Sequence, residues 1–246
     1  MTFIDLVLII LIETPESGCK IMLEVLERNG KENAREYVIR VLRHNIINMN
    51  LKPGQLVSEN EIAEILGVSR TPVREAFIEL SKSSMVEIYP QKGTYISRID
   101  MEMVEESRFV RCVLEKAVVQ LACKMISEAD IVALEENLQL QNSCVIRKDF
   151  KRLLSLDNHF HELLFKACNK VTTYNLIQSM MSHFDRVRIL NLAEMDMQRT
   201  VNDHKEILQA IKDKDEKTAA DLMEKHLTRV IFDQTYLKEV HPEYFK

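Results

Sequence analysis

Glycine and proline are scarce in this chain of 246 residues, which contains five of each. Every glycine lies at or before Gly93, and Pro242 is the only proline after Pro90, so residues 94–241 contain neither. β-Sandwiches, barrels and doubly wound sheets need turn residues at frequent intervals, which this long stretch does not supply. The scarcity therefore argues against those architectures and predicts a mostly α protein with a helical bundle.

A disulfide framework, a membrane segment and a strongly basic balance are missing too. The five cysteines are odd in number and form no C-x-x-C pair, which is typical of reduced thiols in a cytoplasmic protein. The apolar run from Thr2 to Ile12 is too short to span a bilayer and lacks the basic start of a signal peptide. With a net charge of −5, the whole chain is not a basic nucleic-acid coat.

Charge and composition both change near residue 98. Residues 31–98 carry ten Lys and Arg against eight Asp and Glu, a net +2, whereas residues 99–246 carry 21 against 25, a net −4. The mildly basic segment also holds most of the glycines and prolines. We therefore expect an N-terminal extension of unknown role over residues 1–30, one domain over 31–98 and a second over 99–246.

The first of these domains has the pattern of a winged helix-turn-helix. Helical spacing of apolar residues begins at Ala34, and a second helical segment runs from Glu59 to Lys82. Ser58 with Glu61 has the spacing of a capping box, and Gly67 interrupts this second segment as a tight turn does. Alternating residues over 86–89 and 94–97 then predict a β-hairpin, the wing.

The helix that starts after Ser69 has the features of a DNA recognition helix. Arg70 and Arg74 are four residues apart and share one face, and arginine is well matched to guanine in the major groove. The hydroxyls of Ser69 and Thr71 at the helix N-terminus suit phosphate oxygens. Taken alone, the two arginines could equally be solvated surface charges, so the helix-turn-helix spacing and the wing decide in favour of DNA.

Residues Leu51 to Ala76 resemble the DNA-binding domain of the GntR superfamily. They read L-x-P-G-x-x-x-S-E and then I-A-x-x-L-G-V-S-R-T-P-V-R-E-A, of which the last eight letters are highly specific. Two positions depart from the family: Asn60 stands where FadR-type members have a DNA-contacting arginine, and Ser84-Met85 stands where a glycine usually precedes the wing. The residues expected at the DNA are Ser58, Asn60, Ser69, Arg70, Thr71, Arg74, Lys92 and Gly93.

The second domain reads as an all-α bundle of six to seven helices. In its first helix Phe109, Val113, Ala117 and Leu121 recur every four residues, and apolar stripes continue to the end of the domain. A glycine-rich phosphate loop is missing, which argues against nucleotide binding.

Four residues of this domain can meet as one metal site. Asp157 and His161 are four apart on one helix face, while His204 and His226 lie at similar distances from a break at residues 212–215. In an antiparallel helix pair those two histidines would face each other. Three imidazoles and a carboxylate suit Zn²⁺, Ni²⁺ or another divalent ion. The spacing alone slightly favours the alternative that the four are unrelated surface or capping residues.

The same residues resemble the FadR-type C-terminal domain called FCD. The shared pattern includes D-x-x-F-H from Asp157 and H-x-x-I-x-x-A-I from His204, and it reaches His226. The resemblance implies a divalent metal, most often Zn²⁺, held by Asp157, His161, His204 and His226 beneath a pocket for a small organic acid. Arg111 matches the family's R-x-x-L-E pattern and would pair with the acid, or else with an acidic neighbour. Arg188 is a weaker effector-binding candidate, and His44, His159, His183 and His241 are expected at the surface.

These features predict a DNA-binding transcriptional regulator, not an enzyme. We expect a repressor that binds a near-palindromic operator as a homodimer in the cytoplasm, has no membrane partner and responds to an organic acid. The alternative from another class is a metal-dependent hydrolase with a DNA-binding appendage, although no H-E-x-x-H sequence or placed general base is present. A third reading is a DNA-binding protein whose helical domain only clamps a dimer.

Overall fold

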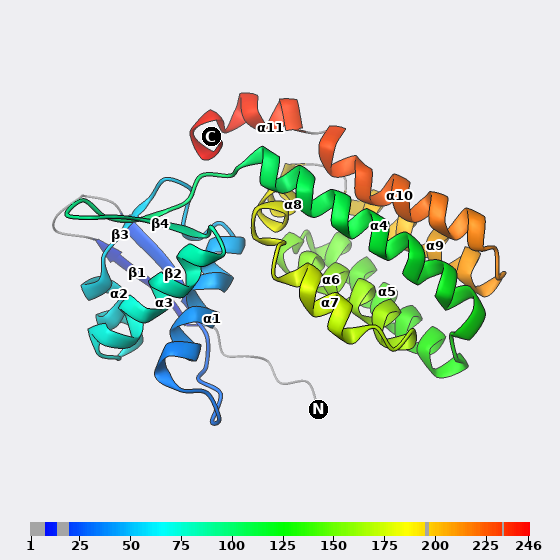
Figure 1. The fold of residues 1–246 in the computed structure, drawn as a ribbon, viewed down its shortest axis with the longest axis horizontal. Helices are drawn as coiled ribbons and strands as arrows, with labels where there is room; N and C mark the ends of the chain where they lie inside the picture. Colours follow the sequence, from blue (N-terminus) through cyan, green and yellow to red (C-terminus); the bar gives the residue numbers. More distant parts are fainter. Residues whose placement is uncertain (1–7, 14–19, 195–196, 233) are drawn as a thin grey trace. The chain divides into compact units, whose positions relative to one another are not determined.

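The chain forms two compact units (Figure 1). The computed structural model describes residues 8–13, 20–194, 197–232 and 234–246. One unit comprises Met1–Asp100 together with His241–Lys246, and the other comprises Met101–Val240. The mostly α architecture, with a winged helix-turn-helix before a helical bundle, is as the sequence predicted.

The first unit is built on three helices and a three-stranded sheet. The helices are α1 (Ala34–Ile47), α2 (Glu59–Leu66) and α3 (Arg70–Lys82), and the strands are β3 (Leu56–Val57), β4 (Val86–Tyr89) and β5 (Gly93–Ile96). The sheet has the antiparallel order β3-β5-β4, so β4 and β5 form the expected wing. Val38, Leu42, Val73 and Phe77 lie in the core that joins α1 to α3.

Local capping in this unit differs in part from the expectation. Ser58 occupies the N-cap of α2, but its side chain makes no capping hydrogen bond, so the predicted capping box with Glu61 does not form. A reciprocal capping box forms instead at α1, between Asn33 and Glu36. Gly67 ends α2 in the left-handed conformation, as its place in the turn predicts.

The N-terminal extension includes a β-hairpin that belongs to this unit. Strand β1 (Leu8–Glu13) pairs antiparallel with β2 (Lys20–Val25). The buried side chain of Asn45 on α1 holds β2: its Oδ1 accepts from the backbone N–H of Glu24 at 2.8 Å, and its Nδ2 donates to the Glu24 carbonyl at 2.9 Å. Leu23 is fully buried in the core. Of the apolar run Thr2–Ile12, residues 2–7 lie outside the described residues.

The last six residues also belong to the first unit, although the expected boundary placed them in the second domain. Ile99 donates its N–H to the carbonyl of Tyr244 at 2.7 Å and accepts from the N–H of Lys246 at 3.0 Å. Phe245 is buried, and Nζ of Lys246 lies 3.2 Å from Oε1 of Glu87 on the wing. Amino-acid composition did not indicate that the C-terminus packs in the first unit, because only six residues at the end of the chain do so.

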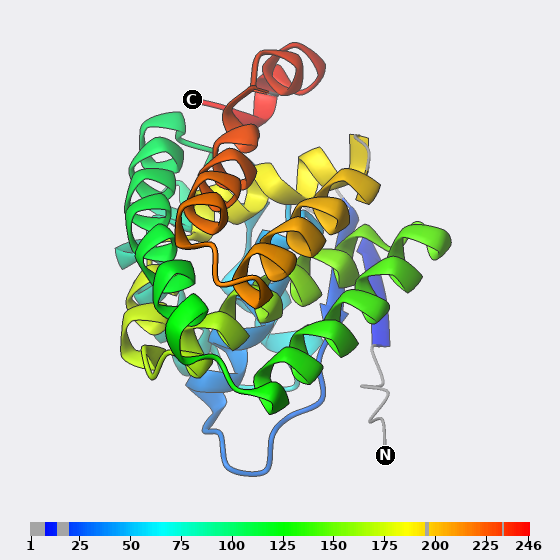
Figure 2. The same ribbon diagram turned by 90° about the vertical axis from the view of Figure 1, so that its right-hand side faces the viewer.

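The second unit is a bundle of helices. In the described part they are α4 (Met101–Met125), α5 (Glu128–Arg147), α6 (Phe150–Ala167), α7 (Val171–Gln178), α8 (Ser182–Glu194), α9 (Met197–Lys212), α10 (Glu216–Phe232) and α11 (Gln234–Val240). This is one more than the upper expectation of seven, and the two short helices α7 and α11 are the ones that apolar periodicity separates least clearly. Two views show α4 and α10 side by side (Figures 1 and 2).

No helix among the described residues is both long and apolar enough to cross a membrane.

Candidate metal centre and nucleic-acid interface

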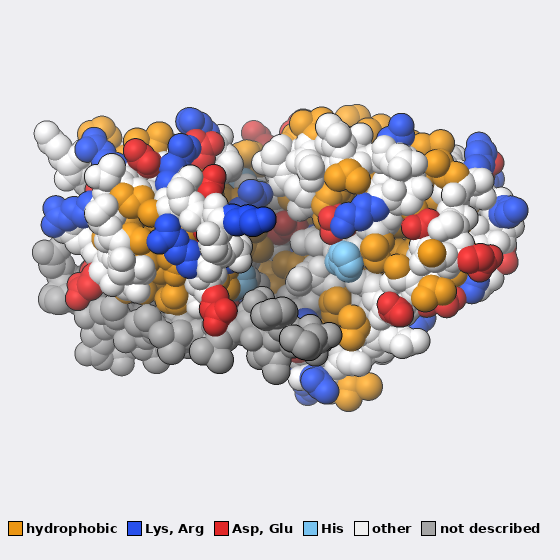
Figure 3. All heavy atoms as spheres, turned by 90° about the horizontal axis from the view of Figure 1, so that it is seen from below, with side chains coloured by type: hydrophobic (Ala, Val, Ile, Leu, Met, Phe, Trp, Pro, Cys, Tyr) orange, Lys and Arg blue, Asp and Glu red, His pale blue; other side chains and the backbone are white. Residues whose placement is uncertain are grey.

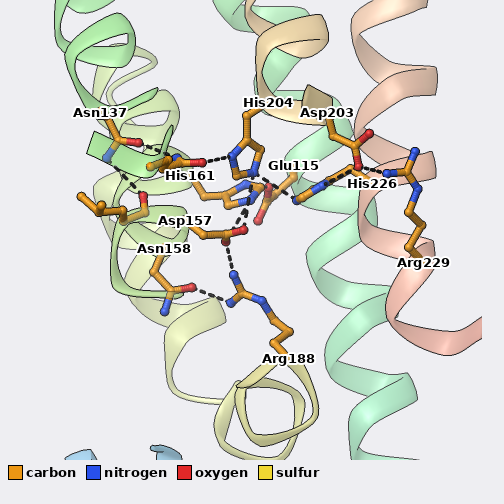
Figure 4. Close-up of polar contacts among 12 residues, drawn as sticks. Glu115, Asn137, Asp157, Asn158, His161, Arg188, Asp203, His204, His226 and Arg229 are labelled. Atoms are coloured by element: carbon orange, nitrogen blue, oxygen red, sulfur yellow. Dashed lines mark hydrogen bonds and ion pairs between the residues drawn. The ribbon is translucent and has the colours of Figure 1, made fainter. Parts of the chain in front are cut away.

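Four side chains with potential metal-ligating atoms converge inside the helical unit (Figure 4). Asp157 and His161 lie one turn apart on α6, His204 comes from α9, and His226 comes from α10. One ligand atom from each lies within 4.8 Å of the others. The structure therefore brings together the complete set that the sequence singled out.

The two helices that carry His204 and His226 form the expected antiparallel pair. The break between α9 and α10 contains Lys214, which has a positive φ of 58°, and Asp215, which caps α10 by accepting from the N–H of Thr218 at 3.0 Å. This turn sets the two histidines at the same height, with their Nε2 atoms 3.3 Å apart.

Each of the three histidines has a polar partner at Nδ1, on the side away from the centre (Figure 4). Nδ1 of His161 faces Glu115 of α4, Nδ1 of His204 lies 2.9 Å from Oε1 of Gln141 on α5, and Nδ1 of His226 lies 3.4 Å from Oδ2 of Asp203. An acceptor at Nδ1 fixes the tautomer that carries its proton there, so the Nε2 lone pair faces the centre. The sequence did not identify these three supporting residues.

Burial sets the charges at the centre. Asp157, His161 and His204 are each at most 3 % exposed. Burial lowers the pKa of His161 to about 4 and takes that of His204 well below its usual value. Burial alone would raise the pKa of Asp157, but Arg188 and the neighbouring imidazoles lower it below its usual range. At neutral pH His161 and His204 are thus neutral and Asp157 is ionised, the protonation states that bind a metal.

The donor set fits a divalent cation. Nε2 of His161 is buried and has no hydrogen-bond partner among the described residues, while Oδ2 of Asp157 lies 3.6 Å away. Leaving a buried donor or acceptor unsatisfied costs about 1–3 kcal/mol. Coordination would satisfy that nitrogen and the Nε2 atoms of His204 and His226 together. Three imidazoles and a carboxylate are ligands that Zn²⁺ and Ni²⁺ accept.

The two arginines singled out for effector binding lie beside this centre. Nε of Arg111 lies 2.5 Å from Glu115, the acid of its own R-x-x-L-E motif, and Nη2 lies 4.0 Å from Asp157. Arg188 contacts Asp157 with Nη2, while its Nη1 lies 2.9 Å from Asp185 and 2.6 Å from Oδ1 of Asn158. Both guanidinium groups are almost wholly buried and hold carboxylates of the chain.

One histidine is misplaced by the sequence analysis. His183 on α8 was expected at the surface, but it is fully buried, with Nδ1 2.9 Å from Nη2 of Arg186. The reason is that residues 182–190 of α8 are all buried, so the polar ones among them give no amphipathic pattern from which to judge exposure. His159 is exposed as expected, whereas His44 is partly buried and lies 2.8 Å from Glu24.

The start of α3 exposes a cationic face. Ser69 stands at the N-cap without a side-chain capping bond, and Arg70, Thr71 and Arg74 are exposed. In the part of the chain that the structure describes, neither guanidinium has an ion-pair partner. Free backbone N–H groups at a helix start, with two unpaired cations one turn apart, can bind phosphate oxygens and guanine edges. On α2, Asn60 is exposed and Ser58 partly so.

The tip of the wing contains Lys92 and Gly93, both exposed. Gly93 has a φ of +109°, and a Cβ at this position would lie 2.7 Å from Cδ1 of Leu56. Only glycine therefore fits between the wing and β3 without strain. Ser84, before β4, adopts a φ of 55°, the left-handed conformation that a glycine would adopt at no cost.

Comparison with known families covers both units. The model described as "Bacterial regulatory proteins, gntR family" matches residues 34–96, and the model described as "FCD domain" matches residues 106–229.

Relatives match along most of the chain. It is 29% identical over 218 residues to the HTH-type transcriptional repressor RspR of Escherichia coli, covering 88% of this chain and 96% of that protein. It is 32% identical over 222 residues to an uncharacterized HTH-type transcriptional regulator of Streptomyces ambofaciens, covering 89% and 92%. None of these names supports the hydrolase alternative.

Solved structures share the fold. The chain is similar to E. coli McbR/YncC, with a TM-score of 0.72 at 20% identity over 83% of this chain and 99% of that one. It is also similar to a putative GntR regulator from Rhodococcus sp. RHA1, with a TM-score of 0.68 at 24% identity over 80% and 97%. With the two domain matches, these findings show that the chain belongs to the gntR family of bacterial regulatory proteins and is a DNA-binding transcriptional regulator with an FCD domain.

Proposed function

We propose that this regulator is a cytoplasmic repressor that binds a near-palindromic operator as a homodimer and responds to a small organic acid. The name of the E. coli relative supports repression. A homodimer presents two recognition helices about one turn of DNA apart, which matches a two-fold operator. An effector shifts the equilibrium only by binding one arrangement of the DNA-binding units better than another.

The helical unit holds a divalent metal, Zn²⁺ or Ni²⁺, through Asp157, His161, His204 and His226. The observation that carries this proposal is the buried His161 Nε2, which has no hydrogen-bond partner among the described residues and faces a carboxylate and two more imidazoles. The polar partners at all three Nδ1 atoms support it further, because metal-ligating histidines usually donate their second N–H in this way. A bound ion supplies a Lewis acid that can take a ligand carboxylate.

Arg111 and Arg188 are the residues that select an acidic effector. Each places a planar guanidinium beside Asp157, and such a group pairs with a carboxylate through two parallel hydrogen bonds. Glu115 and Asp185 keep these side chains in place, so they are oriented before a ligand arrives. Arg111 thus combines the two roles considered for it. It pairs with an acidic neighbour, Glu115, and it also lies beside the centre, where it can meet the effector.

The orientation of Glu162, the candidate general base next to His161 in sequence, disfavours a hydrolase. Glu162 follows His161 on α6, but its carboxylate lies 2.7 Å from Nζ of Lys166 and 3.1 Å from Nδ1 of His159, which is exposed. Glu115, which does reach the centre, is committed to Arg111 and His161. Neither carboxylate is free to take a proton from a metal-bound water.

Elemental mass spectrometry of the tag-free protein tests the metal site. We expect about one ion per chain in the wild type and less than a tenth of that in His204→Ala/His226→Ala. His159→Ala is the matched control, because that histidine lies on α6 beside His161 but is exposed, and it should retain the ion. A wild type without metal after reconstitution with zinc and with nickel would contradict the proposal.

The effector class is then tested by thermal shift of the metal-loaded protein against small organic acids and matched amides. Stabilisation by an acid but not by its amide, and loss of that response in Arg188→Gln with the metal retained, is the expected result. An equal response to acid and amide would contradict an acidic effector without contradicting the metal site.

A further inference from the structure

A hollow of about 480 Å³ opens on the outer face of the three-stranded sheet in the first unit. Glu87 on β4 is paired with Tyr95 on β5, and side chains alternate along a strand, so Glu87, Tyr89 and Tyr95 point to the same side of the sheet. Val86 points to the other side and belongs to the core. All the residues that line the hollow, Lys246 included, belong to the first unit, whereas the candidate metal centre belongs to the second.

Two tyrosine rings form an apolar wall of this hollow. The rings of Tyr89 and Tyr95 meet edge to face, with their centroids 5.7 Å apart and their planes at 79°. The Tyr89 hydroxyl donates to Oε2 of Glu87 at 2.6 Å, and the Tyr95 hydroxyl donates to the carbonyl of Lys92 at 3.4 Å. Because both hydroxyls already have partners, the rings offer a ligand mainly hydrocarbon and π surface. Such a wall favours a ligand with a flat or apolar part.

Three cationic side chains line the same hollow: Lys92, Arg98 and Lys246. Arg98 passes over Gly54, where a Cβ would lie 3.6 Å from Nε of the arginine. Among the residues that the structure describes, neither Lys92 nor Arg98 forms an ion pair, and both are exposed. Lys246 is partly engaged, because its Nζ lies 3.2 Å from Oε1 of Glu87. Two of the three cations are therefore available to an anion from solvent.

Glu87 is the acidic residue among those that line the hollow, and its neighbours compensate its charge. The hydrogen bond from Tyr89 lowers the pKa of its carboxyl, and Lys246 and Arg98 lower it further. With Glu87 ionised, three cations against one carboxylate leave the lining side chains with a net charge of +2. Asp100 lies 3.7 Å from Nζ of Lys246 but is not one of the lining residues. A phosphate monoester carries about −1.5 to −2 at neutral pH, which matches this charge better than a single carboxylate does.

The cations on the helical unit are arranged differently. Lys124, Lys212 and Lys217 each lie 2.7–2.8 Å from a carboxylate. Figure 3 shows Lys and Arg side chains of that unit interspersed with Asp and Glu over one face of the molecule. The exposed apolar residues Phe109 and Val113 of α4 offer no charge to an anion. Unpaired cations beside aromatic rings therefore distinguish the hollow from these surfaces.

We propose that the hollow binds a small organic phosphate monoester, with the phosphate held by Arg98 and Lys92 and the organic part against the rings of Tyr89 and Tyr95. Arginine and lysine both bind phosphate, and a guanidinium can hold two of its oxygens at once. The volume is within the usual range for small-molecule sites, about 300–1,000 Å³. A DNA duplex also presents phosphates, but it keeps its bases stacked inside the helix and would leave the tyrosine rings unused.

This site goes beyond the proposed function, in which the effector binds in the helical unit. Lys92 lies at the tip of the wing and is one of the residues expected at the DNA. A ligand that holds Lys92 therefore competes with DNA, and each lowers the affinity of the protein for the other by the same factor. The DNA-binding unit would thereby respond to an organic phosphate independently of the metal centre.

Isothermal titration calorimetry of the full-length protein with phenyl phosphate tests the site, because this probe combines a phosphate dianion with one ring. Phenyl sulfate has the same ring but a single negative charge, and inorganic phosphate lacks the ring. We expect each of these two to bind at least about 5-fold more weakly than phenyl phosphate. Equal affinities for phenyl phosphate and phenyl sulfate would contradict the proposal, as would a wild type that does not bind phenyl phosphate at millimolar concentration.

Substitutions then locate the bound anion. Arg98→Gln should raise the dissociation constant for phenyl phosphate at least about 10-fold, because it removes a charge-assisted contact. Arg28→Gln is the matched control, because Arg28 is an exposed arginine of the same unit that does not line the hollow, and it should bind as the wild type does. Tyr95→Leu should weaken the binding of phenyl phosphate but not that of inorganic phosphate. Circular dichroism checks that all three variants are folded.

Binding that Arg98→Gln leaves unchanged would place the anion elsewhere, for example at the candidate metal centre. That result would overturn this proposal without contradicting the metal site or the proposed function. Loss of metal binding in the elemental analysis would leave the present site intact in the same way, because its residues belong to the other unit.

The DNA backbone is a second source of the same phosphate chemistry. Fluorescence anisotropy with a labelled duplex of arbitrary sequence, measured over a range of salt concentrations, separates the two sources. With a free ligand, Arg98→Gln should keep the salt dependence of the wild type, and phenyl phosphate should weaken duplex binding more than phenyl sulfate does at the same ionic strength. A salt slope reduced by about one in Arg98→Gln, without binding of phenyl phosphate, would assign the hollow to a DNA phosphate and overturn the proposal.

Discussion

The two units of this protein use charge in opposite ways. At the start of α3, Arg70 and Arg74 are exposed and have no ion-pair partner among the described residues. At the centre of the helical unit, Arg111 and Arg188 are buried and each already holds a carboxylate of the chain. The first arrangement leaves its cations available to solvent, while the second uses charge to hold Glu115 and Asp157 in place at the candidate centre.

This difference predicts different costs of substitution. An exposed, unpaired arginine contributes little to folding, so its removal should affect only binding. A buried member of a charge network cannot be removed without leaving its partners uncompensated in a medium where they are poorly solvated. Stability and DNA affinity should therefore respond to separate sets of variants.

The largest effect on stability is expected for Glu115→Gln. The change removes the negative charge that faces both Arg111 and His161, and breaking a buried pair in this way costs about 3–5 kcal/mol. Glu105→Gln is the control, because it removes an exposed partner of Arg108 on the same helix and should cost less than about 1 kcal/mol. Urea unfolding of both proteins measures the difference, and equal losses would contradict the comparison.

The next effect is a pH dependence confined to the helical unit. Burial holds the pKa of His161 near 4 in the folded, metal-free protein, below its unfolded value of 6.5. The unfolded chain therefore binds more protons between these values, so the free energy of unfolding falls as the pH is lowered from 6.5 towards 4. His204 acts in the same direction.

Urea unfolding of the metal-free protein at intervals between pH 5 and 7 should show this fall, and His161→Gln should flatten it. His159→Gln changes an exposed residue and should keep the wild-type slope. An unchanged slope in His161→Gln would show that other groups govern acid stability.

For DNA affinity the expected change is smaller and leaves stability untouched. Arg74→Ala should weaken operator binding by about 10- to 100-fold, the range for one arginine at a base edge. Lys82→Ala removes a cation from the other end of α3 and should have little effect. Fluorescence anisotropy with a labelled operator measures both, and an unfolding midpoint lowered in Arg74→Ala would mean that this arginine is structural after all.

The four residues of the candidate metal centre could be grouped from the sequence because their spacing allows them to meet, although spacing alone slightly favoured unrelated residues and the resemblance to the FCD domain decided. Asp157 and His161 share a face by helical spacing, and the symmetric distances of His204 and His226 from one turn bring them together. Glu115, Gln141 and Asp203 were not accessible in the same way. Two of them come from other helices, and which helices pack around the centre is settled by tertiary contacts that a one-dimensional pattern does not contain.

Helix α4 shows a second limit of the pattern. Periodicity located the stripe of Phe109 and Val113 correctly but could not say which face of the helix meets the core. The buried face combines apolar residues such as Val118 and Val119 with Arg111 and Glu115, which satisfy one another and the centre, so burying them carries no unpaired charge. The same limit applies to His183, which was expected at the surface but lies in the stretch 182–190 of α8 that is buried on every face.

The smallest effect sharpens the comparison within the DNA-binding unit, at the wing. Gly93→Ala adds a Cβ that would meet Leu56 Cδ1 at 2.7 Å at a residue whose φ is +109°, so we expect a loss of about 1–2 kcal/mol in the stability of this unit. Gly30→Ala is the control, because a Cβ there meets no atom within 4 Å and the backbone is not left-handed. Because Gly93 lies beside Lys92 at the tip, the strained wing should also weaken operator binding by several-fold. Thermal unfolding and anisotropy measure the two consequences, and an unchanged affinity in Gly93→Ala would remove the wing from the DNA interface while leaving α3 within it.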